Sequence, residues 1–267
     1  MGWAASGRLA HDGAMSKLTV FVTGASVGFG EAITRRYVAE GARVFATARR
    51  IDRLNALADE LGDQVVPIEL DVTDRAAVDR VAAEVTADAA VDVLVNNAGL
   101  ALGLEPAQAA DVDEWERMID TNCTGLVYCT RALLPAMVER GSGHVVNLGS
   151  VAGVYPYPGG NVYGATKAFV HQFSLNLRAD LYGTGVRVTC LEPGMASGTE
   201  FSVVRFGGDA ERAADVYAGT EPLQPEDVAE AVVWVTSQPQ RVNINLVEMM
   251  ATVQAFAPFR VYRPGAD

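Results

Sequence analysis

Cysteine and histidine are scarce in this sequence, and neither residue type is spaced like a metal site. The three cysteines, at positions 123, 129 and 190, are odd in number and widely separated. This argues against a disulfide framework and favours reduced thiols in a cytoplasmic protein. The three histidines are too scattered to form a ligand set. We therefore expect no metal ion.

Positive charge is also in short supply. Against 33 acidic residues there are 21 lysines and arginines, which leaves a formal net charge of −12. This balance argues against a nucleic acid or an anionic membrane as a partner. An anionic ligand would have to be drawn by local cations, so arginines in loops are candidate binding residues.

The first residues lack the apolar segment of a secretory signal. Residues 1–16 are too short and too polar to span a bilayer, and Met15 offers an alternative start. We expect these residues to form a flexible N-terminal extension.

Short apolar runs rich in β-branched residues alternate with segments of helical periodicity through the rest of the chain. The expected strands are 18–23, 43–47, 65–70, 91–95, 144–148, 186–191 and 246–250. The expected helices are 31–40, 51–61, one from about 73, 113–140 with a break near 122, one that contains Tyr163, and 225–236. This alternation predicts an α/β single-domain Rossmann fold, a doubly wound seven-stranded parallel sheet with helices on both faces. Ligands of such folds bind at the carboxyl ends of the strands.

The least regular segment runs from about residue 194 to 223, after the sixth expected strand. A loop of this length in a compact domain is usually a lid or a binding loop. We expect it to cover the substrate.

Three glycines follow the first expected strand. Gly24, Gly28 and Gly30 form the pattern G-x-x-x-G-x-G at the start of the first helix. Glycines let the backbone turn sharply and approach a pyrophosphate at a helix N-terminus. An ordinary tight turn would use the same residues, but the position between the first strand and the first helix favours a dinucleotide.

The end of the second expected strand distinguishes the two nicotinamide dinucleotides. An acidic residue there would bind the ribose 2′-hydroxyl of NAD, whereas arginine accommodates the 2′-phosphate of NADP. Arg49 and Arg50 stand at this position, and the first carboxylate is Asp52. Because arginine makes charge-assisted hydrogen bonds to phosphate, we predict NADP(H).

A hydroxyl, a phenol and an ammonium group follow the fifth expected strand. Tyr163 and Lys167 are four residues apart and share one face of a helix, while Ser150 lies at the strand end. A free tyrosine has a pKa of about 10. An ammonium ~5 Å away, at an effective dielectric of ~20, would favour the phenolate by roughly 3 kcal/mol, about two pKa units. Each residue alone is more often structural; their order after the glycine turn favours proton transfer by Tyr163.

These motifs together resemble the short-chain dehydrogenase/reductase family. The resemblance rests on Thr23-Gly24-x-x-x-Gly28-x-Gly30, Asn96-Asn97-Ala98-Gly99, Ser150 with Tyr163-x-x-x-Lys167, and Pro193-Gly194. It extends over nearly the whole chain after residue 16 and identifies residues 17–267 as one NADP-binding domain. It is closest to the NADP-dependent 3-hydroxy acid dehydrogenases, through residues 96–103, 159–169, 198–202, 242–245 and 248–250. That branch includes serine and L-allo-threonine dehydrogenases and malonic semialdehyde reductases.

The resemblance implies roles for further residues. Asp71 and Val72 would contact adenine, Asn122 would hold a water of the proton relay, and Thr199 would lie near the carboxamide or diphosphate. One extra residue precedes Thr199 compared with the family's PG-x-x-x-T spacing. The implied cofactor contacts are Gly24, Ser26, Val27, Gly28, Phe29, Gly30, Arg49, Arg50, Asp71, Val72, Asn97, Ala98, Gly99, Tyr163, Lys167, Pro193, Gly194 and Thr199.

The resemblance further implies a small anionic alcohol or aldehyde as the substrate, held by Ser150 and Tyr163. A carboxylate needs a cation or several hydrogen-bond donors, and Arg205 in the expected loop is our candidate for the cation. The alternative for Arg205 is an ordinary solvated surface arginine. Backbone donors at 159–161 are a second candidate for binding the carboxylate. Three alternatives remain. The protein reduces another small aldehyde such as sulfoacetaldehyde, it acts on bulkier ketones or sugars, or it is a non-catalytic NADP-binding sensor. Sensors typically lose the tyrosine or the lysine, and both are present here.

Family members are usually tetramers or dimers, so we expect a homotetramer or homodimer. Two apolar stripes are compatible with such an interface and equally with core packing: Leu126, Val127, Ala132 and Leu133, and Phe169, Phe173 and Leu177.

Overall fold

The computed structural model describes residues 18–256. The expected N-terminal extension, 1–16, and the last residues of the expected domain, 257–267, lie outside them. One parallel sheet forms the centre, in the order β3-β2-β1-β4-β5-β6-β7. Its strands are β1 (Thr19–Thr23), β2 (Arg43–Ala48), β3 (Val65–Glu69), β4 (Val93–Asn96), β5 (Gly143–Leu148), β6 (Val186–Pro193) and β7 (Leu246–Met249).

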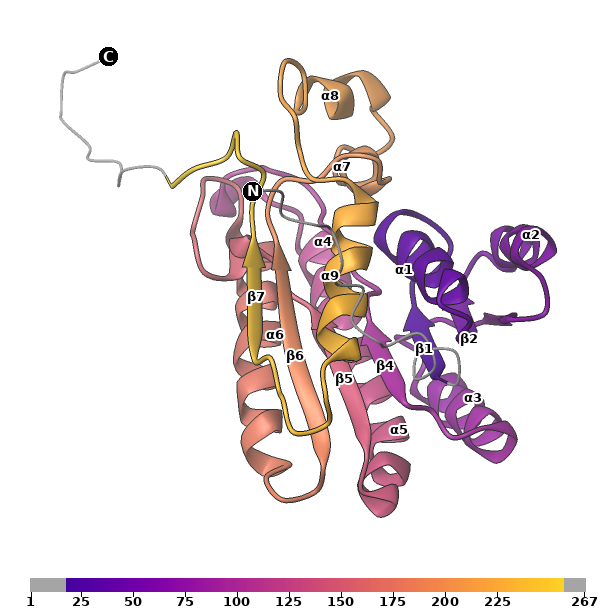
Figure 1. Ribbon diagram of the computed structural model, residues 1–267. Coiled ribbons are helices and arrows are strands. Elements are labelled where there is room, and N and C mark those ends of the chain that lie inside the picture. Colours follow the sequence, from indigo (N-terminus) through magenta and orange to yellow (C-terminus); the bar gives the residue numbers. More distant parts are fainter. Residues whose placement is uncertain (1–17, 257–267) are drawn as a thin grey trace, which may run out of the picture.

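Helices cover both faces of the sheet (Figure 1). The first hydrophobic cluster packs one face against α1 (Gly28–Ala39), α2 (Ile51–Leu61) and α9 (Pro225–Ser237). The second packs the other face against α3 (Arg75–Asp88), α5 (Leu126–Arg140) and α6 (Asn161–Asp180). The doubly wound seven-stranded fold expected from the sequence is confirmed.

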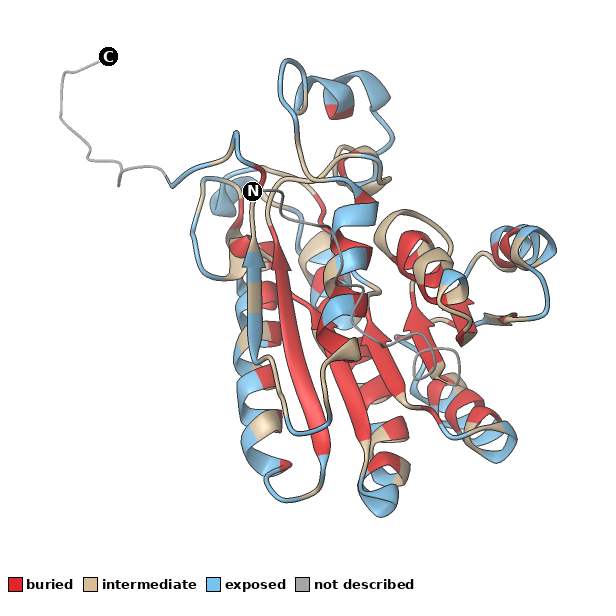
Figure 2. Cartoon of the chain, in the orientation of Figure 1, coloured by how far each residue is buried: buried red, intermediate tan, exposed pale blue. Residues whose placement is uncertain are grey.

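Strand order creates the ligand crevice. The chain runs outward from β1 to β3 and then returns to place β4 beside β1. The helices that follow β1 and β4, α1 and α5, therefore lie on opposite faces of the sheet, and a crevice opens at the carboxyl ends of these two strands. The five inner strands are almost wholly buried, which explains their continuous apolar runs, whereas the edge strands β3 and β7 are partly exposed (Figure 2).

The expected helical region 113–140 is three elements. They are α4 (Val112–Ile119), a π-helix, η3 (Asp120–Gly125), and α5. The break expected near Asn122 is therefore a widened turn. A Cβ at Gly125 would lie 2.6 Å from Val72 Cγ2, so only glycine lets this turn approach the segment after β3.

Two short helices, rather than an irregular loop, lie between residues 194 and 223: α7 (Phe201–Arg205) and α8 (Ala210–Asp215). The side chain of Asp209 caps α8, a local signal that the sequence analysis missed. A backbone bridge between Ala196 and Leu223 joins the ends of the segment. In Figure 1, α7 and α8 lie beyond the carboxyl ends of the strands.

Other boundaries differ by a turn or less. α1 begins at Gly28 rather than 31, because the glycine turn itself enters the helix. α3 begins at Arg75, where the Asp74 side chain accepts the N–H of Ala77. Two single turns complete the described fold, η2 (Ala107–Ala109) and η4 (Val151–Gly153). Among residues 18–256, no helix is long and apolar enough to cross a membrane.

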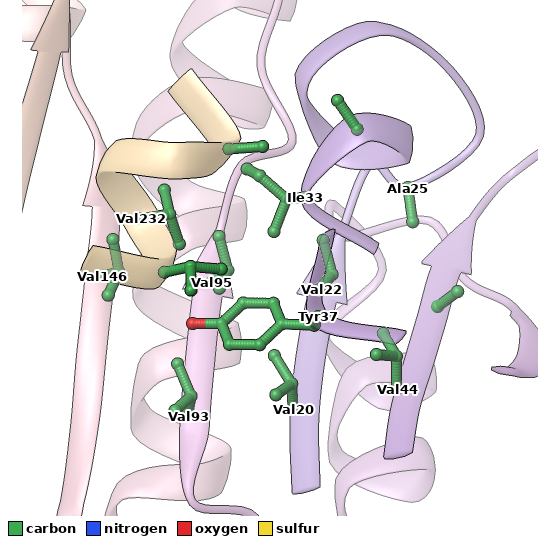
Figure 3. Packing of buried hydrophobic residues seen from close by; sticks show 14 of the residues in the cluster. Val20, Val22, Ala25, Ile33, Tyr37, Val44, Val93, Val95, Val146 and Val232 are labelled. Atoms are coloured by element: carbon green, nitrogen blue, oxygen red, sulfur yellow. The ribbon is translucent and has the colours of Figure 1, made fainter. Parts of the chain in front are cut away.

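Tyr37 joins the helices on one face of the sheet. It is fully buried among apolar side chains that include Val20 and Val95 (Figure 3). Its hydroxyl lies 2.8 Å from Thr236 Oγ1 of α9. A phenol can be buried here because its one polar atom has a partner.

We predict that Tyr37→Phe lowers the free energy of unfolding by about 1 kcal/mol, since one buried hydrogen bond is lost and Thr236 still bonds to Val232. Tyr37→Ala should cost about 3–5 kcal/mol because a cavity forms. Denaturant titration measures both changes. Tyr182, 86% exposed, provides the control Tyr182→Phe, which should change nothing. Equal effects of Tyr37→Phe and Tyr182→Phe would contradict this role.

Candidate active site

The expected glycine turn lies at the crevice between β1 and β4. Gly24 and Gly28 have positive φ angles of 66° and 60°, and a Cβ at Gly30 would collide with the carbonyl oxygen of Gly24. The Asn97 side chain binds this turn, donating to Thr23 O at 2.8 Å and Gly24 O at 3.1 Å. The Asn97 amide is therefore used to shape the turn.

The N-terminus of α1 is open to an anion. Its N-cap residue, Val27, is extended and supplies no side-chain hydrogen bond. The first N–H groups of a helix have no partner within the helix. Such N–H groups and the helix dipole favour an anion at this position. The cofactor contacts predicted for Ser26, Val27 and Phe29 stay predictions.

Three arginines gather where β2 leads into α2. Arg50 Nη1 and Arg53 Nη1 each lie 2.7 Å from the Glu200 carboxylate, and Arg50 Nη2 donates to Ser26 Oγ at 3.2 Å. Arg49 is exposed and has no hydrogen bond or ion pair with another residue of the described chain. Hydrogen bonding, first from Arg50, lowers the pKa of Glu200. Arg49 and Arg50 were predicted from the sequence, whereas Arg53, in the first turn of α2, was not.

The segments after β3 and β4 shape the adjoining wall. The Asp71 carboxylate accepts hydrogen bonds from Thr73, and Val72 is buried against η3. The Ala98 N–H donates to Thr23 Oγ1 at 3.0 Å, and Gly99 follows at the exposed rim. The adenine and ribose contacts of these residues stay predictions.

The Asn96 side chain joins β4 to β5 and α5. Its Nδ2 donates to Asn147 Oδ1 at 2.8 Å and to Thr130 Oγ1 at 2.9 Å, all three residues being buried. These contacts give Asn96 a structural role within the sheet.

Tyr163 and Lys167 lie in the first two turns of α6, on the face toward the sheet. Each is 7% exposed. Lys167 Nζ donates to Leu148 O at 2.8 Å and lies 6.0 Å from the centre of the Tyr163 ring. Ser150 follows β5; its hydroxyl accepts from Ala152 N at 3.1 Å and is 3.4 Å from Pro193 O. The spacing predicted from the sequence therefore brings these three residues to one end of the sheet.

Burial dominates the electrostatics of this group. Desolvation raises the pKa of Tyr163 to about 12, although the Ser150 hydroxyl and the Arg205 charge act in the opposite direction. It lowers the pKa of Lys167 to about 8. Our expectation that Lys167 brings the Tyr163 pKa toward neutrality is wrong for the protein without cofactor, because it left out the cost of burying charge.

Asn122 holds the loop after β4 against α6. Its Oδ1 accepts from Leu100 N and its Nδ2 donates to Leu100 O, both at 2.8 Å; Nδ2 also donates to Thr166 Oγ1 at 3.0 Å. Both polar atoms of the side chain thus have protein partners. A relay water at Asn122 stays a prediction.

The chain after β6 crosses the crevice. Gly194 N donates to Met249 O at 2.8 Å, which fixes the Pro193–Gly194 segment on β7. Thr199 lies over the glycine turn: a Cβ at Gly28 would be 3.0 Å from its side chain. The extra residue before Thr199 therefore does not prevent it from reaching the turn.

Arg205 lies directly above Tyr163. Its guanidinium carbon is 5.5 Å from the centre of the Tyr163 ring; Nε donates to Gly103 O at 3.1 Å and Nη2 to the Tyr157 hydroxyl at 2.8 Å. The Phe201 ring meets Tyr163 edge-on at 5.6 Å. Tyr157 and Phe201 were not predicted from the sequence, because only the folded chain brings them to Tyr163.

At the alternative anion site, residues 159–161, one of the three backbone N–H groups is engaged: Gly160 N donates to Tyr157 O. The Asn161 side chain donates to Glu105 O and accepts from Val162 N. This alternative stays a prediction. No group of three or more potential metal ligands occurs between residues 18 and 256.

The apolar stripes divide between core and surface. Leu126, Leu133 and Leu177 are buried, whereas Phe169 is 40% exposed and stacks on Phe173 at 5.7 Å. Core packing thus accounts for the first three.

Comparison with known proteins agrees with this geometry. Residues 18–206 match the short chain dehydrogenase family model. NADP-dependent 3-hydroxy acid dehydrogenase YdfG of Salmonella typhi is 60% identical over 247 residues, which cover 92% of this chain and 100% of that protein. Serine 3-dehydrogenase of Agrobacterium fabrum is 51% identical, with 92% and 98% covered.

A solved structure, the closed form of serine dehydrogenase complexed with NADP+, superposes with a TM-score of 0.91. It is 59% identical and covers 92% of this chain and 100% of its own. The family match, the sequence relatives and the shared fold lead to one conclusion. This chain belongs to the short chain dehydrogenase family.

Proposed function

We propose that this protein is an NADP(H)-dependent oxidoreductase that interconverts a small 3-hydroxy acid, or a similar anionic alcohol, and its carbonyl form. The observation that carries the proposal is the buried Tyr163 phenol, with Lys167 one turn away and a guanidinium above its ring. A proton donor and an anion-binding group thus lie at the same place. The NADP dependence and the hydroxy acid substrates named for the relatives support it.

The residues at the crevice fit NADP(H). The uncapped N-terminus of α1 suits the pyrophosphate, and Arg49, Arg50 and Arg53 suit the 2′-phosphate. Because the whole chain has a net charge of −12, a cluster of three arginines favours an anionic ligand at this position. The wall residues Asp71, Val72, Asn97, Ala98 and Gly99 would face the adenosine half. Pro193, Gly194 and Thr199 would face the nicotinamide half.

When bound, the cofactor supplies or accepts the hydride. In carbonyl reduction, neutral Tyr163 donates its proton to the substrate oxygen, which the Ser150 hydroxyl orients. A pKa of about 12 keeps Tyr163 protonated at neutral pH. Lys167, with a pKa of about 8, is then mainly charged and stabilises the phenolate that forms.

Arg205 is our candidate for the anionic end of the substrate. Its Nε and Nη2 are engaged by Gly103 and Tyr157, and Nη1 has no hydrogen-bond partner among residues 18–256. The guanidinium is thus oriented while one end stays available to an anion. A sulfonate such as that of sulfoacetaldehyde has the same charge, so it remains the alternative substrate class. A non-catalytic sensor is disfavoured, because such a role has no need of the buried tyrosine and lysine.

The domain, assembly and location belong to the same proposal. We propose that residues 17–267 form one NADP-binding domain in which 194–223 covers the substrate. We further propose a cytoplasmic homotetramer or homodimer. Free Cys123, Cys129 and Cys190 support a reducing compartment, and the exposed apolar residues Phe169 and Leu175 on α6 support an interface there.

Tyr163→Phe should bind NADPH within about twofold of the wild type, because the phenol makes a small part of the cofactor contact. Turnover should fall by about 10²–10⁴-fold, since the proton donor is gone. Cofactor fluorescence measures the first and NADPH consumption the second. Tyr37→Phe, a buried tyrosine away from the crevice, should keep normal turnover. Normal turnover in Tyr163→Phe would refute the assignment.

Arg49→Asp should weaken NADPH binding by about 10- to 100-fold, because a charged hydrogen-bond partner of the phosphate is replaced by a repelling carboxylate. NADH binding should change little. Isothermal titration with both cofactors measures the contrast. The exposed Arg80 of α3 supplies the control Arg80→Asp. Unchanged NADPH affinity in Arg49→Asp would refute this site.

Arg205→Gln should raise KM for malonic semialdehyde by about 10- to 100-fold, because a charged partner of the carboxylate is lost. KM for a neutral aldehyde of similar size should change by less than about threefold, since no such contact is made. Steady-state kinetics measures both, with Arg212→Gln on α8 as the control. Equal losses for anionic and neutral substrates would show that Arg205 acts by packing alone.

A further inference from the structure

Glu200 crosses the cofactor crevice to reach the arginines of α2. It follows β6 and precedes α7, whereas Arg50 and Arg53 belong to the junction of β2 and α2 on the other side. The Glu200 carboxylate pairs with both, at 2.7 Å each. The preceding residue, Thr199, lies on the glycine turn at Gly28. Residues 199–200 therefore span the opening in front of α1.

The same segment is fastened at its other end. Gly103 N donates to Arg205 O at 3.1 Å, and Arg205 Nε donates back to Gly103 O at 3.1 Å. Arg205 also binds the Tyr157 hydroxyl. Residues 199–205, which we call the cover segment, are thus held at Glu200 beside the arginines and at Arg205 beside Tyr163. Phe201 lies between these two attachments and touches the Tyr163 ring.

We propose that Glu200 is a positioning residue that holds the cover segment closed over the cofactor crevice, so that NADP(H) enters and leaves only when its two ion pairs open. The inference rests on the proposed function, in which the arginine cluster receives the 2′-phosphate. It adds a residue that controls how fast the cofactor exchanges. Because Glu200 belongs to the same segment as Phe201 and Arg205, cofactor exchange is also linked to the covering of Tyr163.

The arginine cluster can hold Glu200 and a phosphate together. Arg50 and Arg53 each give Glu200 one terminal nitrogen, and Arg49 gives it none. The three arginines carry three positive charges and Glu200 one negative charge. A phosphate monoester of about −1.5 to −2 at neutral pH nearly balances the remainder. Glu200 and its two ion pairs, which we call the latch, can therefore persist beside a bound phosphate. A residue that competed with the phosphate for these arginines would have to leave when the phosphate binds.

The exposure of the ion pairs limits their strength. The side chains of Arg50, Arg53 and Glu200 are between 34% and 44% exposed. Exposed pairs of this kind are weak and screened by salt. The latch should therefore open often, and its loss should change rate constants by about two- to tenfold.

The test is the rate of NADPH exchange in Glu200→Gln, which keeps the size of the side chain and removes its charge. Stopped-flow cofactor fluorescence should show that the association and dissociation rate constants both rise, by about two- to tenfold. The control Glu211→Gln, on the exposed side of α8, should change neither. A rise in association alone would identify a competitor of the phosphate, a rise in dissociation alone a direct cofactor contact, and no change an inert surface pair. Each of these three outcomes overturns the latch.

A second readout uses the full-length protein without cofactor. Amide hydrogen exchange of residues 199–205 should become faster in Glu200→Gln, and by a smaller factor in Arg53→Gln, because the first change removes both ion pairs and the second removes one. Adding Arg53→Gln to Glu200→Gln should change the exchange little further, since the ion pair of Arg53 is already lost. Unchanged exchange in both variants overturns the latch even where NADPH still binds. Wild-type protein that binds NADPH no better than NADH overturns the proposed cofactor instead.

Discussion

The burial of Tyr163 and Lys167 in one compartment is the constraint on which the site depends. Charge is costly in an apolar surrounding, so the phenol is held neutral and the lysine loses part of its affinity for protons. The same surrounding strengthens any attraction between the two groups once the phenolate forms. A tyrosine of this kind keeps its proton until a substrate oxygen takes it, and the adjacent ammonium then compensates the charge.

The fold produces this compartment from three directions. β5 ends at Leu148, whose carbonyl accepts a hydrogen bond from the ammonium of Lys167, and η3 places Asn122 against the loop after β4. The cover segment closes the third side through Phe201 and Arg205. Because that segment also reaches the arginines of α2, cofactor exchange and access to Tyr163 are physically connected. One chain segment can therefore admit the cofactor, exclude water and orient an anion.

The parts that sequence predicted are local or periodic. Gly30 must lack a side chain because of its own turn, and the four-residue spacing of Tyr163 and Lys167 fixes their shared face whatever surrounds the helix. The Glu200–Arg53 pair joins residues 147 positions apart, and no local pattern indicates it. Desolvation was missed for the same reason: burial belongs to the packed chain, so a pairwise estimate of the Tyr163 pKa had the wrong sign. The short helix α7 was missed because it has no side-chain cap and is held by contacts to distant residues such as Gly103, whereas α8 carries a local signal in its Asp209 cap.

The pH dependence of kcat/KM for NADPH, measured in the direction of carbonyl reduction, tests the account most directly, because it reports ionisations of the free enzyme. Burial lowers the Lys167 pKa to about 8, so the charged form is lost as the pH rises through that value. Tyr163, with a pKa of about 12, stays protonated over this range. The account predicts that kcat/KM is level near neutrality and falls above about pH 8. A profile that stays level up to about pH 10, where a solvated lysine titrates, would contradict it.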